Sequence, residues 1–156
     1  MRLTIAAVGR LKSGPEHALV DDYVARAEAV GRSMALGPVS VVEIDERKAR
    51  DPENQGARLL AAAPDGAIIV ALDERGKALT SPKLADLIAK TRDGGASDMV
   101  FLIGGADGHT DQTRRAATHL LSFGPMVWPH ALARVMLTEQ IYRAVSILGG
   151  SPYHRE

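Results

Sequence analysis

The sequence predicts an α/β protein in which a parallel sheet is covered by helices on both faces, a three-layer arrangement. Short apolar runs alternate with stretches of helical periodicity, the order typical of parallel strands joined by helices. Two runs, residues 67–72 and 98–103, are apolar almost throughout, as strands buried on both faces are. At 156 residues, the chain is expected to form one domain, residues 1–156, because domains usually have roughly 100–200 residues.

Helix starts and stops separate the elements of the first half. Ser13 is expected to cap a helix, with Glu16 three residues on, and Gly31 closes it. Pro64-Asp65-Gly66 ends a second, shorter helix. The predicted elements are strands at 3–8, 39–44 and 67–72, helices at 13–31 and 55–63, and an exposed charged connection at 45–54.

The second half has similar boundaries. Ser81 is expected to cap a helix with Pro82 at its first position, and Pro129 starts the last helix. The predicted elements are a helix from 81, a strand at 98–103, a short helix at 110–118, an irregular apolar stretch at 120–128 and a long helix at 129–149.

Composition excludes several classes of protein. Lys+Arg and Asp+Glu are both 19, so the net charge is +0; this excludes a nucleic-acid binder that depends on bulk positive charge, but not a local basic patch. The absence of Cys excludes disulfides and thiolate catalysis. The histidines show no metal-binding spacing, and no apolar run approaches the roughly 18 residues of a membrane span. We expect a soluble, cytoplasmic protein without a metal.

Ligand sites in parallel sheets lie at the carboxyl ends of the strands, here residues 72–74, 104–105 and the segment after Leu121. Gly104-Gly105 allows either close approach of a ligand to the backbone or an ordinary tight turn. Residues 123–130 contain two prolines and cannot form one regular element. They form either a buried connection or the wall of a site whose amides pair with a planar heterocycle.

The last helix is apolar around most of its circumference, which predicts deep burial or an oligomer interface. Its residues Arg134 and Arg143 either belong to a solvated stripe, with Glu139 and Arg143 as an i,i+4 pair, or meet a carboxylate, phosphate or nucleobase. The tail 151–156 is either a frayed end or a functional segment. Its Tyr-His-Arg combines a stacking ring, an imidazole and a guanidinium.

Six segments resemble the RlmH family of ribosomal RNA methyltransferases, and the resemblance extends over the full length. They are Ala7-Val8-Gly9-Arg10-Leu11-Lys12, Leu72-Asp73-Glu74-Arg75-Gly76-Lys77, Phe101-Leu102-Ile103-Gly104-Gly105-Ala106-Asp107-Gly108, Met126-Val127-Trp128-Pro129-His130, Glu139-Gln140-Ile141-Tyr142-Arg143-Ala144 and Pro152-Tyr153-His154-Arg155-Glu156. The resemblance implies a SPOUT fold with a C-terminal trefoil knot, and a homodimer. It implies methyl transfer from S-adenosylmethionine to N3 of a pseudouridine in helix 69 of 23S rRNA, within the assembled ribosome.

The resemblance also implies site residues. The cofactor is expected to contact Leu72, Gly104, Phe123, Gly124, Pro125, Met126, Val127 and Trp128. The catalytic candidates are Arg143, Tyr153, His154 and Arg155. His154 is one candidate for taking the N3 proton; Arg143 or Arg155 instead stabilises the anion and holds phosphate. The sequence does not choose between them.

One departure from the family supports a rival interpretation. Members often have Ser-Lys-Met-Thr where this chain has Gly124-Pro125-Met126-Val127, which removes side-chain hydroxyls and one backbone N–H. The first rival is therefore a catalytically silent ribosome-associated factor of the same fold. The second is a doubly wound regulatory module that binds another nucleotide.

Overall fold

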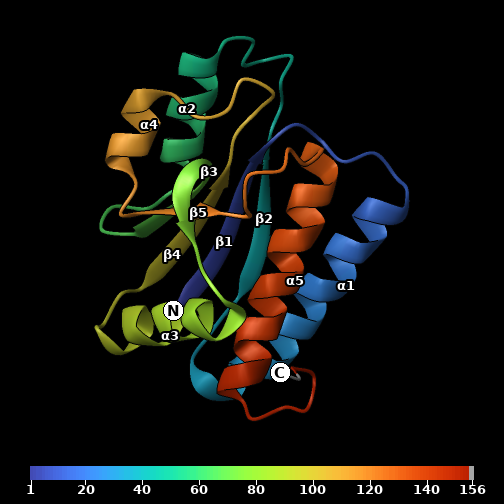
Figure 1. The fold of residues 1–156 in the computed structure, drawn as a ribbon, viewed down its shortest axis with the longest axis vertical. Helices are drawn as coiled ribbons and strands as arrows, with labels where there is room; N and C mark the ends of the chain where they lie inside the picture. Colours follow the sequence, from blue (N-terminus) through green and yellow to red (C-terminus); the bar gives the residue numbers. More distant parts are fainter. Residues whose placement is uncertain (155–156) are drawn as a thin grey trace.

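The computed structural model describes residues 1–154, and a five-stranded sheet with all strands parallel forms its centre (Figure 1). The strand order is β2-β1-β4-β3-β5. The strands are β1 Arg2–Val8, β2 Val39–Ile44, β3 Ile68–Ala78, β4 Asp98–Ile103 and β5 His119–Ser122. β4 is the middle strand, and all of its residues are buried.

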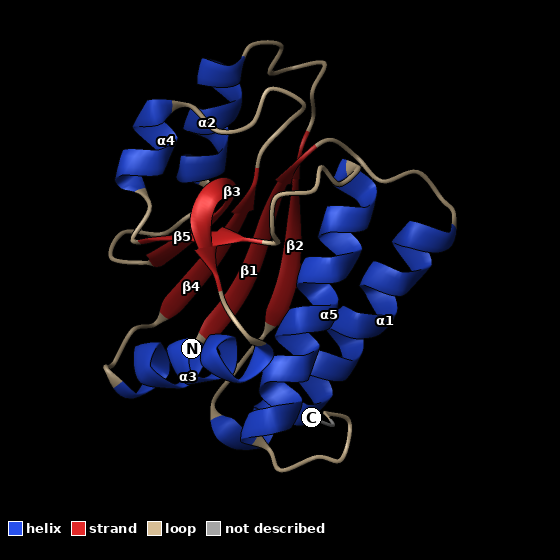
Figure 2. Cartoon of the chain, viewed as in Figure 1, coloured by secondary structure: helices blue, strands red, loops and turns tan. Residues whose placement is uncertain are grey.

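Helices cover both faces of the sheet (Figure 2). One face carries α1 Pro15–Gly31, α3 Ser81–Asp93 and α5 His130–Leu148, with α5 packed against both α1 and α3. The other face carries α2 Pro52–Ala61 and α4 Asp111–Ala116, which lie side by side. A 3-10 turn, Arg32–Met34, follows α1. The predicted three-layer α/β class is confirmed; the trefoil knot stays a prediction.

Alternation along the strands divides the apolar core into two parts. Leu3, Ile5 and Ala7 of β1 pack in the larger core under α1, α3 and α5, whereas Ala6 and Val8 pack in the smaller core under α2. β4 alternates in the same way. Because both faces are filled by side chains, the strand ends are the part of the sheet left for a site.

β3 is interrupted beside β5. Leu72 and Lys77 both lie opposite Leu121, so residues 73–76 leave the ladder. A Cβ on Gly76 would lie 2.6 Å from the backbone atoms of Leu120 and Leu121. Only glycine therefore lets the two strands come this close. The expected strand end at Leu72 and the expected irregular chain from Leu120 are therefore wrong. β5 is a strand because it pairs with β3, a segment distant in the sequence, and a local pattern of residues does not predict such pairing.

Two predicted helix caps are wrong by one residue. Gly14 rather than Ser13 precedes α1, and no side chain caps that end. The side chain of Thr80 rather than Ser81 caps α3. The hydroxyl of Ser81 instead donates to Oε1 of Gln140 at 2.6 Å, which links the start of α3 to α5.

α2 begins inside the segment predicted as a connection, residues 45–54. The carboxylate of Asp51 accepts a hydrogen bond from the N–H of Asn54, and Pro52 occupies the first helical position. The last helix lies where the pattern placed it, within one residue at each end. Among residues 1–154, no helix combines the length and the apolar character needed to cross a membrane.

Candidate active site

Three chain segments meet at the carboxyl ends of β3, β4 and β5 and enclose a cavity of about 410 Å³, here called the strand-end cavity. They are residues 72–75, 103–109 and 122–128. Every residue expected to hold the cofactor lines this cavity: Leu72, Gly104, Phe123, Gly124, Pro125, Met126, Val127 and Trp128. The volume and the position are those of a small-molecule site in a parallel sheet. That these residues bind the cofactor stays a prediction.

Asp73 places a buried carboxylate in the cavity wall. Its side chain is 5% exposed, and its Oδ2 lies 3.4 Å from Nη1 of Arg114. Arg114 also donates to the carbonyl oxygen of His109 and to Asp111, whose pKa it lowers through that hydrogen bond. Arg114 therefore ties the end of β3 to α4 and to segment 103–109. Sequence reasoning singled out the strand end at Asp73 but missed Arg114, which lies in a short charged helix with no motif.

His109 contributes a buried imidazole to the same wall. Its Nε2 lies 3.3 Å from the carbonyl oxygen of Leu102. A carbonyl only accepts, so Nε2 carries the proton and Nδ1 is an acceptor, without a partner in the described part of the chain. Burial lowers the pKa of His109, which keeps the ring neutral near pH 7. Within residues 1–154, no group of three or more acidic or histidine side chains is placed to hold a metal ion.

The glycines after β4 form a tight turn that shapes the cavity. The N–H of Gly108 donates to the carbonyl oxygen of Gly105 at 2.9 Å. A Cβ on Gly104 would lie 3.0 Å from the carbonyl carbon of Gly108. The turn, rather than open space for a ligand, therefore fills the position beside Gly104. Of the two interpretations of Gly104-Gly105, the tight turn is confirmed. The turn also lines the cavity, and the close approach of a ligand to it stays a prediction.

Arg143, Tyr153 and His154 meet around Glu139 of α5, and these four residues are called the tail cluster. The hydroxyl of Tyr153 donates to Oε1 of Glu139 at 2.9 Å. Arg143 donates to the same oxygen from Nη2 at 2.5 Å and from Nε at 3.0 Å. The guanidinium also lies 4.8 Å from the centre of the Tyr153 ring, and its Nη1 lies 3.4 Å from Nδ1 of His154. Arg155, the fourth catalytic candidate, lies outside the described residues.

The tail cluster presents a fixed cation. Glu139 raises the pKa of Arg143 through their hydrogen bonds. Burial, and then the hydrogen bond to Glu139, raise the pKa of Tyr153 far above its usual range, so its hydroxyl stays protonated. A guanidinium only donates, so Nδ1 of His154 accepts and the proton lies on Nε2.

Tyr153 anchors the tail to the fold. Its ring centre lies 4.5 Å from that of Tyr142, and its side chain packs against the larger core. Of the two alternatives for the tail, the frayed end is therefore wrong for Tyr153. The one sign of this in the sequence was an aromatic residue, Tyr153, beyond the last helix. The sequence did not show that it would pack on Tyr142.

The tail cluster does not line the strand-end cavity. Glu139 instead lines a second cavity of about 620 Å³ between α3 and α5, here called the helix cavity. The two cavities share Ser122, Phe123 and Gly124. In one chain, the expected cofactor residues thus line one cavity, whereas Glu139, the partner of Arg143 and Tyr153, lines the adjacent one.

Arg134 joins the start of α5 to the ends of β1 and β2. Nη2 donates to the carbonyl oxygens of Val8 and Gly9 at 3.2 and 2.8 Å. Nη1 lies 3.4 Å from Oε2 of Glu43. Of the two alternatives for the helix arginines, Arg134 meets a carboxylate and carbonyls, whereas Arg143 forms the i,i+4 pair.

Comparison with known proteins identifies the family. A family model described as "Predicted SPOUT methyltransferase" matches residues 1–154. The chain belongs to the SPOUT methyltransferase family. The predicted resemblance is thereby confirmed at the level of the family.

Relatives of this SPOUT methyltransferase match along its whole length. A protein of Dinoroseobacter shibae is 54% identical over 155 residues, which cover 99% of both chains. One of Maricaulis maris is 54% identical over 156 residues, which cover 100% of both. Both relatives are named "Ribosomal RNA large subunit methyltransferase H". A solved structure, the SpoU methyltransferase AviRb of Streptomyces viridochromogenes with AdoMet, is 16% identical with a TM-score of 0.46, covering 96% of this chain and 59% of that one.

Proposed function

We propose that this protein transfers a methyl group from S-adenosylmethionine to N3 of a pseudouridine in helix 69 of 23S rRNA, within the assembled ribosome. The observation that carries the proposal is the convergence of segments 72–75, 103–109 and 122–128 around one cavity at the strand ends. Full-length relatives named as ribosomal RNA large subunit methyltransferases support the substrate class. Action on ribosomes places the protein in the cytoplasm.

The strand-end cavity fits the cofactor. Leu72, Phe123 and Trp128 provide apolar surface for a purine ring, and the backbone of the glycine-rich turn provides polar groups. Pro125 has no N–H and Gly124 no side chain, so contacts in that stretch come from carbonyls and from the neighbouring amides. S-adenosylmethionine supplies a methyl group on a sulfonium, and the protein's main task is to hold that group in line with the acceptor.

The tail cluster suits the acceptor side of the reaction. N3 of the pseudouridine loses its proton as the N–C bond forms and the sulfonium–methyl bond breaks, which leaves S-adenosylhomocysteine. Arg143 is held in place by Glu139 and the Tyr153 ring, so it stabilises the developing anion without reorganisation. For His154 to take this proton, one of two things must happen. Either Nδ1 gives up its hydrogen bond from Arg143 and accepts the proton, or the ring adopts the tautomer in which Nε2 is free to accept it.

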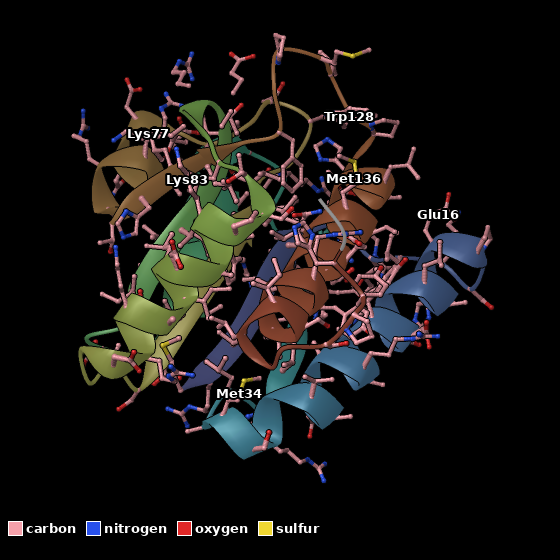
Figure 3. The ribbon with its side chains drawn as sticks, turned by 60° about the horizontal axis from the view of Figure 1, so that its bottom comes forward. Glu16, Met34, Lys77, Lys83, Trp128 and Met136 are labelled. Carbon is pink, nitrogen blue, oxygen red and sulfur yellow. The ribbon has the colours of Figure 1, made fainter. Side chains whose placement is uncertain are left out.

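The reaction requires the tail cluster to reach a strand-end cavity that it does not line in one chain. A second copy of the chain solves this, and we assign the protein a homodimeric state. Met126, Val127 and Leu132 are 70, 93 and 42% exposed, at the rim of the strand-end cavity and the start of α5. Figure 3 shows Trp128 and Met136 in the same region. Exposed apolar surface of this kind is typical of an interface.

The direct test is methyl transfer to ribosomes. Ribosomes from cells lacking the gene are incubated with the purified protein and labelled S-adenosylmethionine, and the rRNA nucleosides are separated by mass spectrometry. We expect one new methylated pseudouridine in helix 69. Ribosomes that gain no label, or gain it at another nucleotide, would refute the assignment.

The departure at Gly124-Pro125 favours one second candidate, a silent ribosome-associated factor of the same fold. Titration calorimetry with S-adenosylmethionine separates the two. Cofactor binding supports the enzyme, whereas ribosome association without cofactor binding supports the silent factor.

A further inference from the structure

A third hollow, which shares Leu79 and Leu121 with the helix cavity, has a mainly positive lining. It has a volume of about 680 Å³ and lies between α3 and the free edge of β5. Its charged lining consists of Arg75, Lys77, Lys83, Lys90 and a single carboxylate, Asp86. We call it the basic groove. His119 adds an imidazole at the strand edge.

The lysines of the chain are concentrated in this groove. The whole chain has five lysines, at 12, 48, 77, 83 and 90, and a net charge of +0, yet three of the five line this groove. Within residues 1–154, no ammonium group of these three forms an ion pair, whereas Arg75 lies only 3.7 Å from Asp73. Figure 3 shows Lys77 and Lys83 on the same side of the molecule. Four cations against one anion make the groove complementary to a polyanion.

The groove is continuous with the proposed site of methyl transfer. Arg75 lines both the basic groove and the strand-end cavity, because residues 73–76 leave the β3 ladder between them. Lys83 and Lys90 are seven residues apart on α3, which places their charges about 10 Å apart along the helix axis at 1.5 Å per residue. The cations therefore form a row that leads away from the cavity.

We propose that the basic groove binds the phosphate backbone of the RNA next to the reacting nucleotide. This inference rests on the proposed function, which makes RNA the substrate. Lysine suits the role, because its compact ammonium pairs with phosphates as a point charge on a flexible stem. The leucines of the groove floor, Leu79, Leu87 and Leu120, accommodate those stems. Such contacts position the substrate and carry no sequence information.

The test compares two double variants, each of which removes two positive charges. K83A/K90A removes two groove lysines at exposed helix positions, where alanine is well tolerated. K48A/R50A removes two exposed cations after β2, at the opposite edge of the sheet. Binding to ribosomes from cells lacking the gene, and to a protein-free RNA hairpin of helix 69 sequence, is measured over a series of KCl concentrations. Methyl transfer by the parent chain to the same ribosomes is recorded in parallel.

We expect K83A/K90A to weaken binding to both RNAs and to lower the slope of log K against log salt by about 1.4–1.8, that is 0.7–0.9 for each lost phosphate contact. The K48A/R50A control keeps the parent slope. An unchanged slope in K83A/K90A overturns the proposal. If that variant also self-associates, the lysines instead serve to keep the exposed edge of β5 from pairing with another chain. Loss of ribosome binding without loss of hairpin binding also overturns it, in favour of an acidic protein surface. Absence of methyl transfer by the parent refutes the proposed function alone, since the slopes still decide the groove.

Discussion

The hydroxyl of Tyr153 donates to Oε1 of Glu139 at 2.9 Å. This contact attaches Tyr153 to α5. The same oxygen of Glu139 also accepts from the guanidinium of Arg143, which lies over the Tyr153 ring. Tyr153 is therefore part of the fold, so replacing it tests the stability of the tail separately from its proposed part in the reaction.

Tyr153→Ala should destabilise the protein by about 1–3 kcal/mol, because it removes an aromatic pair and a hydrogen bond to a carboxylate at a half-buried site. Tyr153→Phe should cost less, since it keeps the ring beside Tyr142. Urea denaturation followed by circular dichroism measures both. The control is Ser151→Ala in the same tail, which removes no side-chain hydrogen bond among the described residues and should unfold as the parent does. Equal stability of Tyr153→Ala and the parent would show that the tail is not anchored.

Arg134→Met should destabilise by about 2–4 kcal/mol, less than the loss of a fully buried pair because Glu43 is partly exposed. The variant leaves the carbonyl oxygen of Gly9 without its 2.8 Å donor. Arg32→Met, at an exposed i,i+4 pair, is the control and should change stability by less than about 0.5 kcal/mol. Similar losses in the two variants would contradict a special role for Arg134.

Stability should fall as pH decreases from about 7.5 to 5.5, because of His109. Burial lowers its pKa in the folded state, so the unfolded chain binds the proton first as pH passes below the ordinary value of about 6.5. Thermal unfolding across this range measures the effect. His109→Leu should flatten the profile; a profile as steep as that of the parent would assign the dependence to another group.

Gly104→Ala should weaken binding of S-adenosylhomocysteine with the fold retained. The added methyl meets the backbone of Gly108 at 3.0 Å, so the turn that forms the cavity wall must shift. Calorimetry measures the affinity and circular dichroism the fold. Gly14→Ala, where the new Cβ makes only ordinary contacts at 3.9 Å, is the control. Unchanged affinity in Gly104→Ala would place the ligand elsewhere.

The protein should sediment as a dimer at micromolar concentration, and Leu132→Lys should shift it toward the monomer. A lysine at this exposed position of α5 charges the proposed interface. Val42→Lys, on the edge strand β2, is the control, because charged side chains are tolerated on sheet edges. A parent chain of monomer mass would contradict the dimer.

The pattern of neighbouring residues predicted those strands and helices whose formation does not depend on pairing with a distant segment. β2 and β4 lie where the sequence pattern placed them. Every residue of β4 is buried, so burial on both faces made it a continuous apolar run. In the edge strand β2 only Val39 and Ile44 are buried. β5 and the return of β3 at Lys77 were missed, because they exist only through pairing with each other. Gly76 was the one local sign, since its missing side chain permits the approach.

The candidate site was predicted unevenly for a similar reason. Residues at strand ends, such as Leu72 and Gly104, follow from the rule that parallel sheets bind ligands there. Arg114 was missed because its partner, Asp73, is distant in the sequence. The role of Glu139 depends on Tyr153, which lies beyond the end of its helix. Periodicity reports which face of a helix is apolar and does not report which carboxylate an arginine will meet.

The central place of β4 has a consequence for synthesis on the ribosome. β3 pairs with β4 and β5, both of which follow it in the chain, so an apolar strand leaves the exit tunnel before either neighbour exists. β1, α1 and β2 can assemble early as a crossover unit, but β3 must wait for the residues up to Ile103. During that interval β3 is exposed to wrong partners and to chaperones. A pause in translation after β4 has left the exit tunnel should therefore favour correct assembly, whereas a pause while β3 is outside and β4 is still inside should favour aggregation.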